Sequence, residues 1–175
     1  MKQFFTLLAA AILIAGCTKF EIDDDQWPVV KSGKISAQEF RENIIGHGWN
    51  SGLTYRIVNG RVTKEVLDEL AGFRSGDYYF DENTVTTFIS PDHNPVSGYY
   101  VRTFKYNESD CSIYINGYKS MTIVNLTKNK FEAIRQTGTK SDGTKSFGYV
   151  TYTRMSEEEI ADTRKNYSTD LDTVG

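Results

Sequence analysis

Between Trp49 and Met155 the sequence consists of strand-like segments joined mostly by short turns. The segments are rich in Tyr, Phe, Ile, Val and Thr, which favour half-buried pleated strands. Asn116-Gly117 is the clearest turn, because these two residues accept the positive φ angles of a tight hairpin. Short turns place each strand beside the next, which favours a meander. We predict eight strands, at roughly 49–58, 77–81, 84–90, 98–107, 111–116, 118–126, 130–137 and 146–155.

Eight strands can close into a barrel, which removes the exposed sheet edges and leaves an interior for side chains or a small ligand. Helices are expected on both sides of the strand region. Ser36 with Glu39, and Ser156 with Glu159, each form a capping-box pattern. We therefore predict a mainly β fold: an eight-stranded antiparallel meander barrel with a short N-terminal helix and a C-terminal helix over 156–166. An open, curled sheet packed on a helix is the alternative.

Three connections are longer than the rest, at 60–76, 90–98 and 137–146. The first contains a run that could form a helix capped by Thr63 and reaching Leu70. Strand turns alternate between the two ends of a meander, so we expect all three connections at the end opposite Trp49. A ligand would then enter between them. The candidate ligand-binding residues at this rim are Phe73, Tyr99, Tyr100 and Arg102, although aromatic residues at such positions more often serve core packing.

The N-terminus has the order of a secretory signal. Lys2 precedes an apolar run from Phe4 to Ala15, and a small residue, Gly16, stands at the cut site. The stretch Leu13-Ile-Ala-Gly-Cys17 resembles the lipobox of bacterial lipoproteins. This resemblance implies that residues 1–16 are removed and that Cys17 carries the acyl chains, such as palmitate, that hold the chain to a membrane. An ordinary signal peptide with a Cys near its cut site is the alternative.

Residues 17–34 are polar and acidic, with Asp23-Asp24-Asp25 in a row, and are expected to form a flexible tether. Their pattern resembles the export tag of surface lipoproteins from gut Gram-negative anaerobes. That resemblance implies a lipid anchor in the outer membrane of the cell envelope, with surface exposure. A periplasm-facing anchor stays open. The barrel domain is expected to span 35–166, and residues 167–175 are expected to form a disordered tail.

The barrel region resembles the lipocalin-like lipoproteins from Ile35 to Asn166. The resemblance is carried by Trp49, at the start of the first strand, and Arg154, at the end of the last. It implies that the guanidinium covers the indole and closes one end of the barrel. The family places a Gly two residues before the Trp, where this sequence has His47.

Charge and composition argue against several functions. Removal of residues 1–16 takes away one charge, Lys2, and leaves 19 basic against 23 acidic residues, a balance of −4 that does not suit nucleic acid. The two histidines, His47 and His93, have no cysteine neighbours, so no metal site and no cofactor are expected. With Cys17 lipidated, Cys111 has no intramolecular disulfide partner and is expected to be a buried thiol.

The sequence shows no nucleophile elbow and no Cys placed with a His and an acid, so we expect no enzyme. Two functions remain. The first is a binding module for a small lipid or glycan ligand. The alternative is an accessory subunit of an outer-membrane surface complex, with a filled barrel and a protein partner. A cavity inside the barrel would favour the first, and a filled interior would favour the second.

Overall fold

A computed structural model describes residues 19–22, 26–67, 76–89 and 97–173. The expected signal sequence 1–16, Cys17 and the candidate Phe73 lie outside the described residues, as does His93. Within the described part of the chain, no helix has the length and apolar character needed to cross a bilayer.

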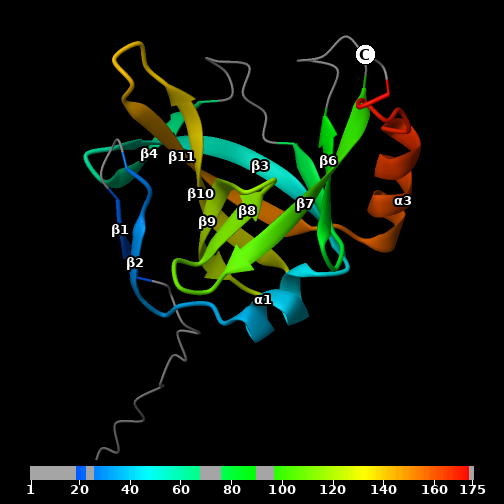
Figure 1. The fold of residues 1–175 in the computed structure, drawn as a ribbon, viewed down its shortest axis with the longest axis horizontal. Helices are drawn as coiled ribbons and strands as arrows, with labels where there is room; N and C mark the ends of the chain where they lie inside the picture. The colour runs from blue at the N-terminus through cyan, green and yellow to red at the C-terminus, as the bar shows by residue number, and fades with distance from the viewer. Residues whose placement is uncertain (1–18, 23–25, 68–75, 90–96, 174–175) are drawn as a thin grey trace, which may run out of the picture.

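The strands close into the predicted barrel (Figure 1). Each strand of the ring pairs antiparallel with its neighbour, and the last strand returns to the first, with Gly148 opposite Arg56 and Arg154 opposite Trp49. The fold is therefore mainly β, an eight-stranded antiparallel meander barrel, as expected. The ring consists of β3 (His47–Val58), β5 (Asp77–Phe80), β6 (Thr84–Ile89), β7 (Gly98–Asn107), β8 (Ser112–Ile115), β9 (Tyr118–Leu126), β10 (Lys130–Thr139) and β11 (Lys145–Arg154).

The prediction of a helix that begins at Thr63 is wrong for the described residues of this segment. Arg61–Val66 forms strand β4, which pairs with β3 outside the ring. The tight turn explains the difference, because Asn59 (φ 50°) and Gly60 (φ 67°) both adopt the left-handed conformation that a two-residue hairpin requires. The Thr63 hydroxyl donates to the Arg56 carbonyl at 3.0 Å instead of capping a helix. Residues 68–70 of the expected helix lie outside the described residues.

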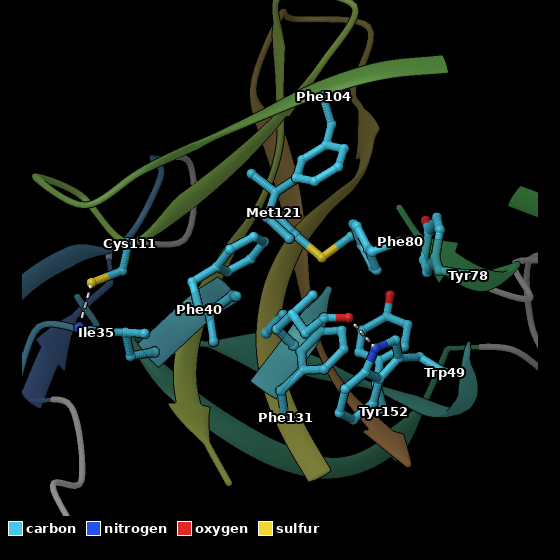
Figure 2. Close-up of a cluster of buried hydrophobic side chains, with 14 of the residues drawn as sticks. Ile35, Phe40, Trp49, Tyr78, Phe80, Phe104, Cys111, Met121, Phe131 and Tyr152 are labelled. Atoms are coloured by element: carbon cyan, nitrogen blue, oxygen red, sulfur yellow. Dashed lines mark hydrogen bonds between the residues drawn. The ribbon is translucent and has the colours of Figure 1, made fainter. Parts of the chain in front are cut away.

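Aromatic side chains fill the part of the barrel interior shown in Figure 2. Trp49, Phe80, Phe131 and Tyr152 are fully buried. The Phe131 and Tyr152 rings stack with centroids 4.4 Å apart, and the Trp49 indole meets Phe131 edge-on at 4.9 Å. The interior is thus a packed core here, with aromatic contacts that each contribute about 0.5–1.5 kcal/mol beyond their buried area.

Both capping boxes predict their helices correctly. Helix α1 (Ala37–Ile44) follows Ser36 and lies at the end of the barrel where Trp49 is buried, and the indole N–H donates to the Ile44 carbonyl at 3.4 Å. Its Phe40 ring stacks on Tyr106 with centroids 4.1 Å apart. Helix α3 (Glu157–Asn166) follows Ser156 and lies on the flank of the barrel (Figure 1).

The expected flexible tether is ordered in its described part, which corrects the prediction for 17–34. Strands β1 (Lys19–Glu21) and β2 (Val29–Ser32) pair antiparallel. Phe20, Ile22 and Trp27 pack on the outside of the barrel, against a second apolar cluster. These residues interrupt the acidic run, and it is their apolar area that docks the segment. The cluster they cover comprises Ile57, Val124, Ile134, Phe147 and Tyr149.

The C-terminal tail is also ordered where the structure describes it, which corrects the prediction of disorder for 167–175. The Thr169 carbonyl accepts the Tyr99 N–H at 2.9 Å, and the Leu171 N–H donates to the Tyr99 carbonyl at 3.0 Å. Asp170 forms a parallel bridge to Tyr99. Residues 169–171 therefore run beside the beginning of β7.

Cys111 is a free, fully buried thiol. Its sulfur accepts the Ile35 N–H at 3.3 Å, at the point where the chain leaves β2 and approaches α1 (Figure 2). The predicted burial is confirmed. Cys111 serves as a small apolar residue that also satisfies one backbone donor.

Candidate functional site

One face of helix α3 packs against the outside of the barrel. Ile160, Arg164 and Tyr167 are spaced four and three residues apart, so they lie along the same face of the helix. Ile160 is buried over β3, where Gly48 makes room for it. A Cβ atom at Gly48 would lie 2.8 Å from Ile160 Cγ1 and 2.7 Å from Met155 Sδ. The position therefore requires glycine if the helix is to lie this close to the strand.

The next two residues on this face contact the following strands. The Arg164 guanidinium lies over the Tyr79 ring of β5, 4.5 Å from its centroid. The Tyr167 and Phe88 rings meet at 5.9 Å between centroids, with an angle of 55° between their planes. The helix thus passes from β3 over β5 to β6, and its apolar contact weakens along the way, because Ile160 is its one buried residue.

A groove remains between the end of α3 and the outer face of β6 and β7. Its volume is about 370 Å³, within the usual size range of small-ligand sites. Among the described residues, three aromatic side chains and one guanidinium line it, together with one threonine and one serine. The lining residues are Thr86, Phe88, Tyr99, Arg164, Tyr167 and Ser168.

The groove has a definite chemical character. Among the described residues that line it there is no carboxylate. The aromatic faces offer flat apolar surface, and Arg164 offers a positive charge held against Tyr79 by a cation–π contact. Such a surface suits a small molecule with one apolar face and an anionic group.

The structure separates the four residues that sequence reasoning placed at one rim. Tyr99 lines the groove. Tyr100 and Arg102 share the other face of β7 with Phe104 by strand alternation, and the Arg102 guanidinium lies 4.8 Å from the Tyr100 centroid. Arg102 is held by both carboxylate oxygens of Asp172. Phe73 lies outside the described residues, so the structure brings only Tyr99 to the candidate site.

Sequence reasoning missed Phe88, Arg164 and Tyr167. Signals for them existed in the pattern. Phe88 and Thr86 alternate with the inward-facing Val85, and Arg164 and Tyr167 fall on the Ile160 face of the predicted helix. What the sequence lacked was the strand over which that face would lie.

The described ends of the long connections lie on one side of the barrel. The end of β6, the beginning of β7 and the hairpin between β10 and β11 all lie opposite α1 (Figure 1). The described parts thus agree with the shared rim that was predicted. The aromatic groove, however, lies on the outer flank below that rim.

A hollow of about 320 Å³ does occur near this rim. Its described lining residues include Arg56, which forms an ion pair with Glu65 at 3.3 Å, and one aromatic residue, Phe147. A third hollow, of about 250 Å³, lies beside α1. The flank groove combines three aromatic walls with a volume larger than that of either hollow, and we take it as the candidate site for that reason.

The expected Trp49–Arg154 pair is a pair of cross-strand neighbours. The Trp49 indole is buried in the core, while the Arg154 guanidinium lies against the His47 ring at 2.7 Å and donates to the Lys128 carbonyl at 3.3 Å. Burial lowers the pKa of His47, and the neighbouring Arg154 charge lowers it further. The histidine two residues before Trp49 therefore supplies a partner for the arginine.

In residues 19–22, 26–67, 76–89 and 97–173, no three His, Cys, Asp or Glu side chains gather as ligands for a metal ion.

Asp77, at the beginning of β5, has a carboxyl group with a raised pKa. Burial raises the pKa of Asp77, although the backbone and hydroxyl of Ser51 donate hydrogen bonds that oppose the shift. Asp77 is held in place by Ser51, which gives it a structural role between β3 and β5.

Comparison with known proteins gave no relative to which the site could be compared: no model of a protein family matches the chain, and no curated protein matches it.

Proposed function

We propose that this protein is a non-enzymatic binding protein of the bacterial cell envelope, anchored by lipid at Cys17, which binds a small acidic glycan in the groove between α3 and the β6–β7 face. The observation that carries the proposal is the contrast between a barrel interior packed with aromatic side chains and an aromatic groove of about 370 Å³ on its flank. We therefore propose a ligand site on the outer flank of the barrel and not at its mouth.

The residues of the groove support this class of ligand. The apolar face of a sugar ring packs well on tyrosine and phenylalanine, and Phe88, Tyr99 and Tyr167 provide such faces. A carboxylate on the sugar would pair with Arg164, since guanidinium and carboxylate form charge-assisted hydrogen bonds. The hydroxyl groups of Thr86 and Ser168 add donors and acceptors for the sugar's own hydroxyls.

The test is a titration of the purified domain with digalacturonate, followed by calorimetry and by amide shifts in NMR spectra. We expect binding that is at least tenfold weaker for Tyr99→Ala and Arg164→Gln than for the wild type. Tyr118→Ala is the matched control, because Tyr118 is a tyrosine 80 % exposed on β9. Equal binding of neutral cellobiose and digalacturonate, or equal loss in the control, would count against the proposal.

The lipid anchor is tested separately. We expect Cys17→Ser to yield an uncut precursor or a soluble protein, because no thiol remains to accept the acyl chains. Membrane fractionation and the mass of the N-terminal peptide measure this directly. A variant that stays in the membrane at the wild-type level with residues 1–16 removed would contradict the anchor.

The packed interior also favours the second candidate, an accessory subunit that binds a protein in an outer-membrane complex. In that case the flank and the rim would bind a macromolecule and not a sugar. Crosslinking in membranes from a photoreactive residue at position 86, on the β6 wall of the groove, separates the two: a single protein adduct supports the subunit, and its absence together with glycan binding supports the first proposal.

A further inference from the structure

Strand β7 has one edge that the barrel leaves incompletely paired. On one side β6 pairs with residues 98–103 of β7. On the other side β8 pairs only with residues 104–107, and the Asn116 N–H reaches the Thr103 carbonyl. The edge from Gly98 to Arg102 therefore has backbone groups that β8 does not reach.

The C-terminal segment occupies this edge through an isolated parallel bridge between Asp170 and Tyr99. Tyr99 uses both its N–H and its carbonyl, which bond to the Thr169 carbonyl at 2.9 Å and the Leu171 N–H at 3.0 Å. Figure 1 shows the C-terminal segment beside the beginning of β7. Backbone bonds of this kind provide affinity for any extended chain and carry little sequence preference.

Two side-chain contacts add a sequence preference. A Cβ atom at Gly98 would lie 2.6 Å from Leu171 Cγ, so a glycine at this position gives the leucine its place. Arg102 Nη2 donates to Asp172 Oδ1 at 2.7 Å, and Nη1 donates to the other carboxylate oxygen. The hydrogen bonds from Arg102 also lower the pKa of Asp172. The edge thus recognises an apolar residue followed by an acidic one.

The occupant is held where solvent can compete for it. The side chain of Arg102 is 30 % exposed and that of Asp172 is 49 % exposed, and exposed ion pairs are weak. Two backbone bonds, one apolar contact and one exposed ion pair form a small contact, which a better-matched chain can displace.

We propose that the β7 edge from Gly98 to Arg102 is a docking site for an extended acidic peptide of a partner protein, with an apolar residue before an aspartate, and that residues 169–172 occupy this site until the partner replaces them. The site is separate from the glycan groove in its chemistry. The groove uses the Tyr99 side chain, whereas the edge uses the Tyr99 backbone and the Arg102 side chain.

The experiment uses a chain truncated after Ser168 and a fluorescent peptide of the sequence Thr-Asp-Leu-Asp-Thr-Val-Gly, which is that of residues 169–175. By anisotropy, we expect the truncated protein to bind the peptide at least tenfold more tightly than the full chain does. Replacement of the second aspartate of the peptide by asparagine, or Arg102→Gln in the protein, should each weaken binding at least tenfold. Lys105→Gln, at an exposed lysine of the same strand, is the matched control.

A second variant covers the case in which truncation unfolds the domain. The full-length double variant Leu171→Gly with Asp172→Asn keeps the chain length but removes both side-chain contacts, and the peptide should then bind it as well. No binding by either variant when its circular dichroism is native, or binding unchanged by Arg102→Gln, would overturn the proposal. A concentration-dependent dimer of the full chain that disappears on truncation would also overturn it, since the occupant would then be a second copy.

Failure of the glycan proposal can be told apart from failure of this one. Tyr99→Ala removes a wall of the groove but leaves the backbone edge, so it should weaken digalacturonate binding and leave peptide binding within twofold. Arg102→Gln should have the opposite effects.

Discussion

Two terminal segments cover the outside of the barrel, and they do so in different ways. The N-terminal segment brings Phe20, Ile22 and Trp27 onto the face formed by β3, β9, β10 and β11. The Trp27 ring meets Phe147 edge-on with centroids 5.1 Å apart, and Lys119 Nζ lies over the Trp27 ring, 5.2 Å from its centroid. Helix α3 covers β3, β5 and β6 with one buried residue, Ile160.

The difference shows what decides whether a covered face becomes a site. Apolar side chains at alternating positions seal the first face into a second core. Helix α3 is polar and is buried against the barrel only near its beginning, at Ile160. At its other end, Arg164 and Tyr167 contact the strands and keep the helix away from them. The space beneath that end is the groove. A segment that contributes little apolar area thus leaves surface available for a ligand.

We expect the largest loss of stability in the barrel interior, and Trp49→Ala tests this. We expect a loss of about 3–5 kcal/mol in the free energy of unfolding, because a fully buried aromatic residue is removed from a packed core. Urea unfolding measures the change. Leu53→Ala is the control, since Leu53 is 51 % exposed and should change stability by about 0.5 kcal/mol or less.

The sealed face is tested by Ile22→Ala. Ile22 is 7 % exposed within the outer cluster, so we expect a loss of about 2 kcal/mol, the low end of the range for such changes. Val29→Ala, at a residue 55 % exposed in the same segment, should have little effect. Equal small effects of the two substitutions in urea unfolding would show that burial of Ile22 adds little to stability. They would contradict the difference that we draw between the two covered faces.

The open face is tested by Ser156→Ala. The Ser156 hydroxyl accepts the Glu159 N–H at 3.2 Å, and the Glu159 carboxylate accepts the Ser156 N–H at 2.7 Å. Loss of such a cap costs about 1 kcal/mol. Since α3 buries one residue, we expect amide exchange across 157–166 to rise more than exchange across α1 rises in the matched variant Ser36→Ala. Protection unchanged across α3 would show that packing, and not the cap, holds the helix.

The smallest effect concerns the beginning of β3 and the end of β11, where His47 contacts Arg154. The pKa of His47 is lower in the folded protein than in the unfolded chain, first because of burial and then because of the Arg154 charge. As pH falls through the ordinary histidine range near 6.5, the unfolded chain binds the proton first, so stability falls with it. His47→Gln should flatten the dependence of unfolding free energy on pH between about 5 and 7. An equal slope in both proteins would contradict this origin.

Sequence by itself determined the elements of this protein. Alternation and turn residues predicted the eight strands of the ring, because successive side chains of a strand point alternately into the barrel and out of it. The two capping boxes predicted where both helices begin, since a cap is a local hydrogen-bonding pattern. The turn at Asn59-Gly60 is equally local, but Thr63 was interpreted as a helix cap, and strand β4 was not predicted.

Only the tertiary structure decided where the covering segments lie. Phe20, Ile22 and Trp27 stand in an acidic stretch whose composition predicts disorder, and their burial depends on an apolar face formed by strands far along the chain. The groove has the same origin, since Phe88, Tyr99 and Tyr167 come from two strands and a helix that meet only when the barrel is closed. Local patterns fix the faces of each element, whereas the contact between two faces depends on apolar area that no local pattern contains.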